Sequence, residues 1–351
     1  MKHTHYQKIL ILPDAGPENP FQYQMINFLR SNGFDVSIGT KRKLGSIYYA
    51  VNQFNPEIIY FDWVHSYVIG KTFLWSFIKS LFFVFDILYL RFLRKIPIVH
   101  TLHNIQNHGG FWIPWEHFIY GFFLRRCSKI RVYSEAVKKE VIIKFRILSS
   151  AVYIIQDIPF HYYYQNNSTR KESRIHLNIA EKGFVFLFFG KVKIYKGLEN
   201  LIRSFLSIAG PDDHLLIAGA CAEEKYIAEL KNISNNSNQI IWHIRFIPKE
   251  DVQCFFNAAN VVVLPFTKID HSGSLDLALS FSKPVITLKT EAIFDLLSHQ
   301  KNLLFEKGDD LKMAMALAKE INEEEIGKNN FKIADSANYR DLTELFKKYA
   351  S

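Results

Sequence analysis

The chain has 351 residues, of which 48% are hydrophobic and 22% charged; this composition excludes a disordered protein, and the length predicts about two domains. The net charge is +9, and residues 1–160 hold all of it, with 19 Lys and Arg against 10 Asp and Glu. Three cysteines, Cys127, Cys221 and Cys254, have no metal-ligand or CxxC spacing, which argues against a disulfide framework and favours a reducing cytoplasm.

The first part of the chain alternates short apolar strands with helical patterns. A helix is expected over residues 19–30, after the first strand. The strands themselves are expected at 8–13, 35–40, 57–61, 98–102, 130–133 and 152–155. Strands that alternate with helices form parallel sheets, so residues 1–160 are predicted to be one doubly wound domain.

Residues 161–174 are expected to be a linker, because HYYYQNNSTRKES has no periodicity and is rich in turn formers. Residues 175–335 then repeat the strand and helix alternation as a second domain. Its strands are expected at 184–189, 215–218, 240–242, 261–264 and 285–288. The last stretch, 336–351, has a helical pattern.

A very apolar helix is predicted over Phe73–Phe92. One stripe at helical spacing is able to face a core: Leu74, Ile78, Leu81, Phe85, Leu88 and Phe92. Further apolar residues lie outside this stripe, at Phe77, Phe83, Val84 and Leu90. No uncharged span of about 18 residues is left for a membrane crossing, because of Lys71, Lys79, Asp86 and Arg91. Two interpretations stay open: a doubly buried helix, and a helix in a membrane interface next to Arg91, Arg94 and Lys95.

Two strand-to-helix turns in the second domain carry small and cationic residues. In Asn260–Thr287, a strand and a polar loop lead to a helix that opens at Ser272-Gly273-Ser274, where N–H groups and the helix dipole favour an anion. In Phe184–Phe205, a strand ends at Gly190 and is followed by Lys191, Lys193, Lys196 and Gly197. Because ligands bind at the carboxyl ends of strands in such sheets, both turns are candidates to bind one pyrophosphate.

These two segments resemble the family 4 glycosyltransferases of the GT-B fold. Gly190-Lys191 with Lys196-Gly197 is similar to the family signature G-R-x-x-x-x-K-G, and Asn260–Ile286 is similar to its donor-site segment. Within the second segment, the motif S-G-S…A-L-S-F-x-K-P-V-I is more similar to the bacterial exopolysaccharide and capsule members of the family than to its better-known members. The resemblance implies two doubly wound, Rossmann-like domains facing a cleft. The acceptor-side domain would be 1–160 and the donor domain 175–335, and the helix in 336–351 would cross back to the first domain.

The resemblance also implies roles for individual residues at the donor site. Lys191 and Lys196 would neutralise the charge that grows on the β-phosphate as the glycosidic bond breaks, which makes both catalytic candidates. Lys191 stands where the family usually has Arg, so it supplies a point charge and no bidentate fork. The further donor-binding candidates are Gly16, Gly190, Asp270, Ser272, Gly273, Ser274 and Asp276.

A histidine at the end of the fourth strand is the third catalytic candidate. His103 matches a family histidine that contacts the transferred sugar, and a histidine there can act as a general base or an orienting donor. On the acceptor side the candidates are His65, Asn104 and His108.

The chain departs from the family at a pair of glutamates spaced Glu-x7-Glu. Ile269 and Leu277 stand at the two positions in register, and Asp270 and Asp276 are the candidate substitutes one position away. Since the glutamate pair goes with the retaining members of the family, the stereochemistry of transfer stays open.

These features together predict a metal-independent glycosyltransferase without a cofactor. It would move a sugar from a UDP- or GDP-linked donor to a lipid-linked saccharide in surface-polysaccharide biosynthesis. The basic first domain favours an anionic membrane surface as partner, and the lack of basic–aromatic interleaving argues against nucleic acid. The predicted location is therefore cytoplasmic, peripheral on the inner face of the plasma membrane. The alternatives are an inactive GT-B-like scaffold, a sugar-nucleotide epimerase, and a phosphorylase, whose cofactor-lysine motif is not found.

Overall fold

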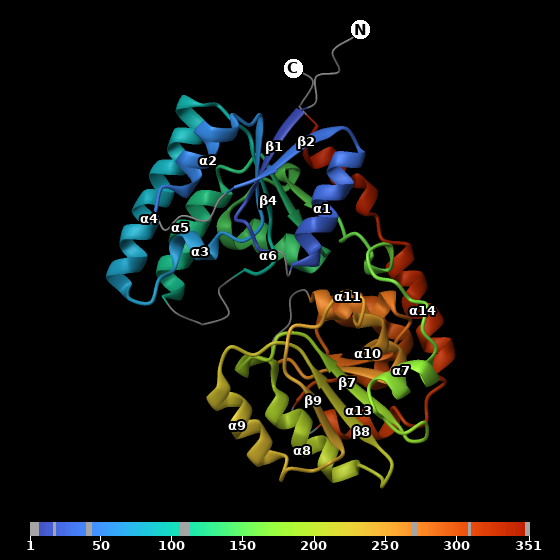
Figure 1. The fold of residues 1–351 in the computed structure, drawn as a ribbon. Helices are drawn as coiled ribbons and strands as arrows, with labels where there is room; N and C mark the ends of the chain where they lie inside the picture. The colour runs from blue at the N-terminus through green and yellow to red at the C-terminus, as the bar shows by residue number, and fades with distance from the viewer. Residues whose placement is uncertain are drawn as a thin grey trace. The chain divides into compact units, whose positions relative to one another are not determined.

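The computed structural model describes residues 7–16, 19–39, 44–105, 112–267, 272–307 and 310–347 (Figure 1). The chain forms two compact units: unit 1 comprises residues 1–158 and 338–351, and unit 2 comprises residues 159–337. Each unit contains one six-stranded, fully parallel sheet with helices between the strands. The predicted fold class, two doubly wound parallel-sheet domains, is confirmed.

The sheet of unit 1 has the order β2-β1-β3-β4-β5-β6. Its strands are β1 (Gln7–Leu12), β2 (Phe34–Ile38), β3 (Ile58–Phe61), β4 (Ile98–Thr101), β5 (Lys129–Val132) and β6 (Val152–Ile154). Its helices are α1 (Pro20–Ser31), α2 (Ser46–Phe54), α3 (His65–Val68), α4 (Phe73–Leu88), α5 (Ile113–Leu124) and α6 (Glu135–Phe145). Unit 1 also contains the short helical turns η1 (Tyr89–Leu93), η2 (Ser149–Ala151) and η6 (Tyr339–Leu345).

Two apolar cores lie on opposite faces of this sheet. One contains buried residues of α2, α4 and α5, such as Val51, Phe83 and Phe123. The other contains Leu29 of α1 and Phe346, which follows η6. Figure 1 shows the red C-terminal segment beside α1. The segment 338–351 is therefore part of unit 1.

The sheet of unit 2 has the order β12-β11-β10-β7-β8-β9. Its strands are β7 (Val185–Phe189), β8 (His214–Ala218), β9 (Ile240–His243), β10 (Val261–Leu264), β11 (Val285–Leu288) and β12 (Leu304–Phe305). Its helices are α7 (Arg170–His176), α8 (Leu198–Ile208), α9 (Glu224–Ile233), α10 (Val252–Ala258), α11 (Gly273–Ser280), α12 (Glu291–Leu297), α13 (Asp310–Leu317) and α14 (Glu323–Asp335). The turns η3 (Phe160–Tyr162), η4 (Ile194–Lys196) and η5 (Ser298–Leu303) link them.

The segment 161–174 differs from its expected role as a linker, because it belongs to unit 2. Helix α7 begins inside it, and Thr169 and Glu172 form a reciprocal capping box at its start. The buried guanidinium of Arg174 donates hydrogen bonds to the carbonyl of Ala258 at 3.0 Å and to Asn260 Oδ1 at 2.9 Å. The T-x-x-E spacing is a known sign of a helix start, and it outweighs the turn-rich composition of the segment.

The apolar stripe of the helix predicted over Phe73–Phe92, which would be able to face a core, is mostly exposed. Leu74 is 68% exposed, Phe85 61% and Phe92 67%. The buried residues of α4 are Ser76, Ser80, Phe83, Asp86 and Ile87. The serines can be buried because Ser76 Oγ donates to the Thr72 carbonyl at 2.9 Å and Ser80 Oγ to the Val68 carbonyl at 3.3 Å. The doubly buried interpretation is therefore wrong, since α4 is buried on one face only.

Candidate functional sites

In unit 2, the carboxyl ends of β7 and β10 lie next to each other in the middle of the sheet. The chain winds from β7 to β8 and β9 on one side, and continues at β10 on the other side of β7. This is the topological switch point, where open α/β sheets bind ligands. The two turns singled out in the sequence are the loops that leave these two strands.

The two loops bring Gly190, Lys196 and Ser274 together. A Cβ atom on Gly190 would lie 2.9 Å from Ser274 Oγ and 3.1 Å from Lys196 Nζ. Gly197 follows η4 with a φ of 70°, and a Cβ atom there would lie 2.2 Å from the Pro265 carbonyl oxygen. Gly197 is thus required by the close approach of backbone from the other loop, whereas Gly190 is required by its φ of 135°, which L-residues rarely adopt.

Lys196 is a half-buried cation. Its Nζ lies 5.7 Å from the ring centroid of Phe188 and 5.2 Å from that of Phe266. Burial, and in second place the charge of Lys191, lower the pKa of Lys196 to about 8. Among the described residues no carboxylate forms an ion pair with Lys196, whereas Lys193 in the same loop pairs with Glu223 at 3.8 Å. Lys196 is therefore placed to bind an anion from solution.

The start of helix α11 lies at the same place. Ser272 is its N-cap residue and accepts no capping hydrogen bond from the helix. The first N–H groups of a helix have no acceptor within the helix, and its positive dipole end favours an anion. Gly273, Ser274 and Asp276 lie in the first turn, while Asp270 lies outside the described residues.

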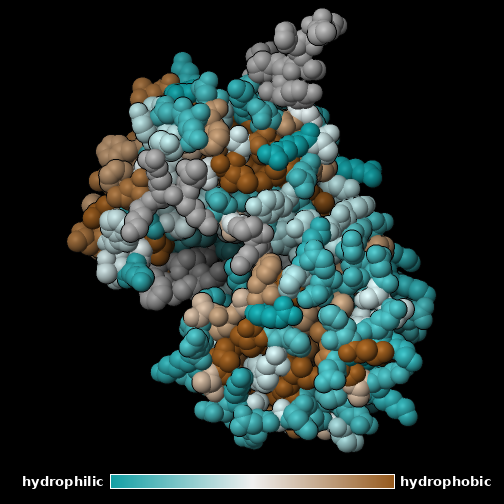
Figure 2. Space-filling model, viewed as in Figure 1, coloured by the Kyte–Doolittle hydropathy of each residue, from teal (hydrophilic) through white to brown (hydrophobic). Residues whose placement is uncertain are grey.

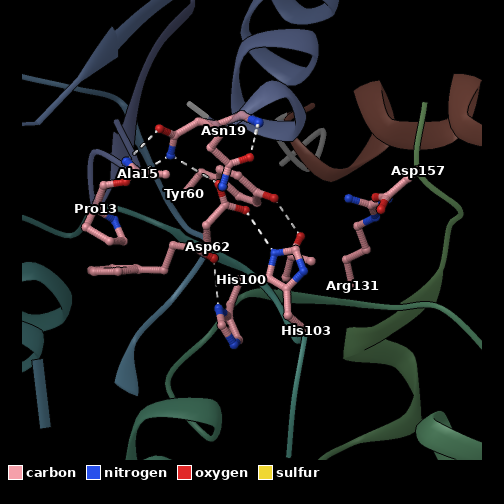
Figure 3. A network of polar contacts seen from close by, with 12 residues as sticks. Pro13, Ala15, Asn19, Tyr60, Asp62, His100, His103, Arg131 and Asp157 are labelled. Carbon is pink, nitrogen blue, oxygen red and sulfur yellow. Dashed lines mark hydrogen bonds and ion pairs between the residues drawn. The ribbon is translucent and has the colours of Figure 1, made fainter. Parts of the chain in front are cut away.

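In unit 1, polar side chains converge at the carboxyl ends of β1, β3 and β4 (Figure 3). Asp62 follows β3, and its side chain is fully buried. Its backbone N–H donates to the Leu12 carbonyl at 2.8 Å, and its carboxylate accepts a hydrogen bond from Gln22 Nε2 at 3.3 Å. Asp62 therefore links β3 to α1 through its carboxylate and to the end of β1 through its backbone.

His103 joins this network through both of its ring nitrogens. Nε2 lies 3.3 Å from Asp62 Oδ1, and Nδ1 lies 3.0 Å from the Tyr133 hydroxyl. The imidazole stacks on Trp63, with a centroid distance of 4.7 Å and an angle of 14°, and meets Phe21 edge-on at 5.0 Å. The ring is thus held on its faces and its edges, so its orientation is fixed.

A buried ion pair supports the network from β5. Arg131 is fully buried, donates from Nε to the Ile155 carbonyl at 2.9 Å and pairs through Nη2 with Asp157. Its guanidinium lies 4.9 Å from the ring centroid of Tyr133. Although burial opposes it, the neighbouring side chains of Tyr133 and Asp157 raise the pKa of Arg131, so Arg131 remains a cation that holds Tyr133 in place.

His65 lies at the start of α3, just after β3. Its Nδ1 is 2.6 Å from Oε1 of Glu116, which lies in the first turn of α5. The Glu116 side chain is 1% exposed and that of His65 is 19% exposed. Nearby, His100 is fully buried between the Phe61 carbonyl and the Tyr120 hydroxyl, and burial lowers its pKa to about 3, so His100 is neutral.

The other predicted residues of this unit lie close by in the chain. Gly16 follows β1 with a φ of 85°, and its N–H donates to Asp14 Oδ1 at 2.7 Å. Asn104 is half-buried directly after His103, and His108 lies outside the described residues. Asp62 and Glu116 were missed by sequence reasoning. The position of Asp62 at a strand end was a usable signal, but nothing in the sequence marks Glu116.

A metal site was not predicted for this chain. Within the described ranges, no group of three or more His, Cys, Asp or Glu side chains could hold a metal ion.

Comparisons with known proteins agree with the fold. Residues 169–336 match the family described as "Glycosyl transferases group 1". A structure of HepE (Alr3699) from Anabaena in complex with UDP-glucose aligns with a TM-score of 0.73 and 17% identity over 97% of this chain and 99% of that chain. The protein thus has the GT-B fold that the sequence resemblance implied, and its residues 169–336, just under half of the chain, are similar to group 1 glycosyltransferases.

Two curated relatives are similar over part of their length. The capsular polysaccharide biosynthesis glycosyltransferase CapM of Staphylococcus aureus is 29% identical over 167 residues, which are 46% of this chain and 43% of that protein. The GDP-mannose:glycolipid 4-beta-D-mannosyltransferase of Xanthomonas campestris pv. campestris is 27% identical over 106 residues, 30% of each protein. The aligned part thus spans less than half of either relative.

Proposed function

We propose that this protein is a glycosyltransferase that takes its sugar from a nucleotide-diphospho-sugar. The proposal rests on Lys196, a half-buried cation whose ammonium lies beside Gly190 and Ser274. No carboxylate among the described residues forms an ion pair with it. A departing nucleoside diphosphate gains negative charge at its β-phosphate, and fixed cations and N–H groups stabilise that charge. The HepE complex contains UDP-glucose and the Xanthomonas relative is named for GDP-mannose, which supports a UDP- or GDP-linked donor.

The reaction is proposed to need no metal ion and no cofactor. Lys191 and Lys196 supply two positive charges, and the start of α11 adds N–H groups at the same turn. These groups perform the neutralisation that a divalent cation provides in metal-dependent transferases. Lys191 is exposed, so it can move onto the diphosphate when the donor binds.

The acceptor is proposed to be a lipid-linked saccharide that binds unit 1 at the strand ends carrying His65, His103 and Asn104. Similarity to a capsule biosynthesis enzyme supports a role in surface-polysaccharide assembly. Partly exposed polar side chains next to fixed aromatic rings suit sugar hydroxyl groups, because the rings order the site and the polar atoms give direction.

The protein is proposed to act at a membrane surface, and the argument for this rests on helix α4. Helix α4 buries two serines and Asp86 beside Phe83, while Leu74, Phe82 and Phe85 face solvent. Figure 2 shows the hydrophobic residues gathered over this part of unit 1. On length and composition alone, Phe73–Leu93 could cross a membrane. Because its inner face is bonded to the rest of unit 1, we propose that it lies in the interface of the inner leaflet, beside the exposed Lys71, Arg91 and Lys95.

The donor proposal is tested by thermal unfolding in the presence of UDP, GDP, ADP or CMP. A diphosphate that binds the native state raises the unfolding midpoint. Lys196→Ala should weaken that binding by about 1–3 kcal/mol, the range for a hydrogen bond to a charged group. Lys193→Ala is the matched control, because Lys193 lies in the same loop but pairs with Glu223. If the nucleotide raises the unfolding midpoint equally in both variants, Lys196 does not belong to the donor site.

An inactive scaffold of the same fold is the second candidate, and one observation favours it. Leu277, at the position of the family's second glutamate, is 5% exposed and belongs to the core of unit 2. A scaffold would bind the nucleotide sugar without cleaving it. Slow release of the sugar from the donor in the absence of acceptor would distinguish the transferase from the scaffold.

A further inference from the structure

We propose that Phe266, together with Phe188, holds Lys196 charged and in place for the diphosphate of the sugar donor. This inference rests on the proposed donor site and adds to it the residues that position its cation. Every contact that supports it lies within unit 2. The two phenylalanines, called the aromatic pair below, are positioning residues, because they act on the donor through Lys196.

Two three-residue segments, one after β7 and one after β10, are in contact at both of their ends. The Thr267 hydroxyl donates a hydrogen bond to the Tyr195 carbonyl at 3.2 Å. A Cβ atom on Gly197 would lie 2.2 Å from the Pro265 carbonyl oxygen, so the two backbones also approach closely there. The middle residues of the two segments are therefore held opposite each other.

These middle residues are Lys196 and Phe266. The Lys196 ammonium lies 5.2 Å from the ring centroid of Phe266 and 5.7 Å from that of Phe188. Both rings are buried in the core of unit 2. A cation within about 6 Å of a ring centroid is attracted by the negative face of the ring. The aromatic pair thus defines where the ammonium lies.

An aromatic ring stabilises a cation without neutralising its charge. Lys193, in the same loop, forms an ion pair with Glu223 at 3.8 Å, and a phosphate could bind Lys193 only in competition with that carboxylate. Among the described residues no carboxylate pairs with Lys196 in this way. Burial, and in second place the charge of Lys191, lower the pKa of Lys196 to about 8. The ring quadrupoles act in the opposite direction, because they favour the ammonium.

The charged groups around Lys196 leave this role to the aromatic pair. In the described segments that border Lys196, the titratable groups are Lys191, Lys193, Tyr195, Glu199, Glu223 and Asp276. Lys191 lowers the pKa of Lys196, while Lys193 and Glu223 pair with each other. Burial raises the pKa of Tyr195, so its hydroxyl is neutral near pH 7. The attraction that keeps Lys196 charged therefore comes from the two rings.

The test weakens this attraction without changing the shape of the site. Phenylalanine with one, two or three fluorine atoms on its ring is placed at position 266 of the full chain. Fluorine withdraws electron density, so the ring attracts a cation less strongly. The pKa of Lys196, measured in the free protein from the NMR shift of its Cε atom, should fall with each fluorine, by up to about one pH unit with three. The Cε signal is assigned from its loss in Lys196→Ala.

Diphosphate binding should follow the same order. In calorimetric titrations with UDP or GDP, the pH above which affinity falls should decrease with each fluorine. Phe266→Leu, which keeps an apolar side chain but removes the ring, should weaken binding about 2- to 30-fold, the range for a cation–π contact. In Lys196→Ala the same substitution should cause no further loss, because the ring acts through the lysine.

Phe189→Leu is the matched control. Phe189 precedes Gly190 on β7, and its ring packs against Phe256 with a centroid distance of 4.9 Å. This substitution should leave the pKa of Lys196 and the affinity for UDP or GDP unchanged.

Two results would overturn the role of the aromatic pair and leave the donor site in place. One is a pKa of Lys196 that stays constant across the fluorine series. The other is an equal loss of binding from Phe266→Leu with and without Lys196. If the pKa falls as expected but the wild type binds no nucleoside diphosphate, the rings do hold Lys196 charged and the proposed function fails.

Discussion

Gly190 and Ser274 approach so closely that a Cβ atom on Gly190 would lie 2.9 Å from the Ser274 hydroxyl oxygen. Gly190 also has a φ of 135°, which L-residues rarely adopt. We therefore expect Gly190→Ala to strain the backbone and displace the Ser274 hydroxyl, lower stability by roughly 1–3 kcal/mol and weaken diphosphate binding. Thermal unfolding with and without UDP or GDP measures both effects.

Gly273→Ala is the matched variant for this prediction. Its Cβ atom would lie 3.9 Å from the nearest other atom, on Phe160, so the folded protein accepts it without strain. It should weaken diphosphate binding while the unfolding midpoint of the free protein stays the same. A Gly190→Ala variant that binds like the wild type would contradict the placement of the phosphate between these loops.

Diphosphate binding should depend on pH through Lys196. Its pKa of about 8 lies below the ordinary value of 10.5, so the ammonium loses its proton as pH rises from 7 to 9. A neutral amine does not offset phosphate charge, and affinity should fall up to about tenfold per pH unit above pH 8, as expected for one linked proton. Calorimetric titration with UDP or GDP between pH 7.5 and 9.5 checks this. Lys196→Ala should bind weakly with a flatter pH dependence.

The exposed face of α4 should bind anionic vesicles. Each Lys or Arg near such a surface contributes about 1 kcal/mol, and the exposed Phe and Leu side chains add a contribution that salt does not screen. Co-sedimentation with vesicles of phosphatidylserine and phosphatidylcholine should therefore fall as salt rises and level off above zero. Phe82→Glu with Phe85→Glu should abolish it, because these side chains are 45% and 61% exposed.

Phe83 provides the internal control for the vesicle experiment. It is 2% exposed and packs in a core of unit 1, so Phe83→Glu should lower the unfolding midpoint, whereas the exposed pair should leave it nearly unchanged. A native protein that ignores anionic vesicles at low salt would rule out the interfacial role of α4.

Activity should survive removal of divalent cations. The proposed donor site relies on Lys191, Lys196 and the start of α11, and these groups remain in EDTA. Turnover of the donor should therefore be the same, within about twofold, before and after dialysis against EDTA. A loss that Mg²⁺ or Mn²⁺ reverses would show that a metal ion carries the charge instead.

Asp86 should make unit 1 less stable as pH rises. Burial against the rest of unit 1 raises the pKa of its carboxyl from 3.8 to about 7. The folded state then binds a proton more tightly than the unfolded state, so this stabilisation is complete below pH 4 and disappears as pH rises to about 7. Asp86→Asn should raise the unfolding midpoint at pH 8 by roughly 2–8 °C and leave it unchanged at pH 4.

The fold could be predicted from the sequence because buried parallel strands are continuous apolar runs. Val261–Leu264 and Val285–Leu288 match their predicted bounds. The strand Leu304–Phe305 was missed, because two residues carry no periodic signal. The prediction of which face of α4 is buried was wrong for another reason. Hydropathy predicts that phenylalanine and leucine lie on the buried face, but serine hydroxyls that donate hydrogen bonds to backbone carbonyls are also stable there.

The candidate sites were predictable only in part. The glycines and lysines of the donor turn stand in one short stretch of sequence and were found there. The contact between His65 and Glu116 joins residues 51 positions apart, and it depends on how α5 packs against the end of β3. Packing of that kind leaves no local pattern, so the pair could be seen only in the structure.

Because unit 1 is built from residues 1–158 and 338–351, the order in which the units can finish folding is the reverse of their order along the chain. On the ribosome, unit 2 has all of its residues once Ala337 has emerged. At that moment Ile9, Ile11 and Tyr60 still lack the side chains of Leu342, Leu345 and Phe346, which cover them in the finished protein. Unit 1 is thus completed last, and a nascent chain halted before Asn338 would expose part of the apolar side of its first sheet to chaperones.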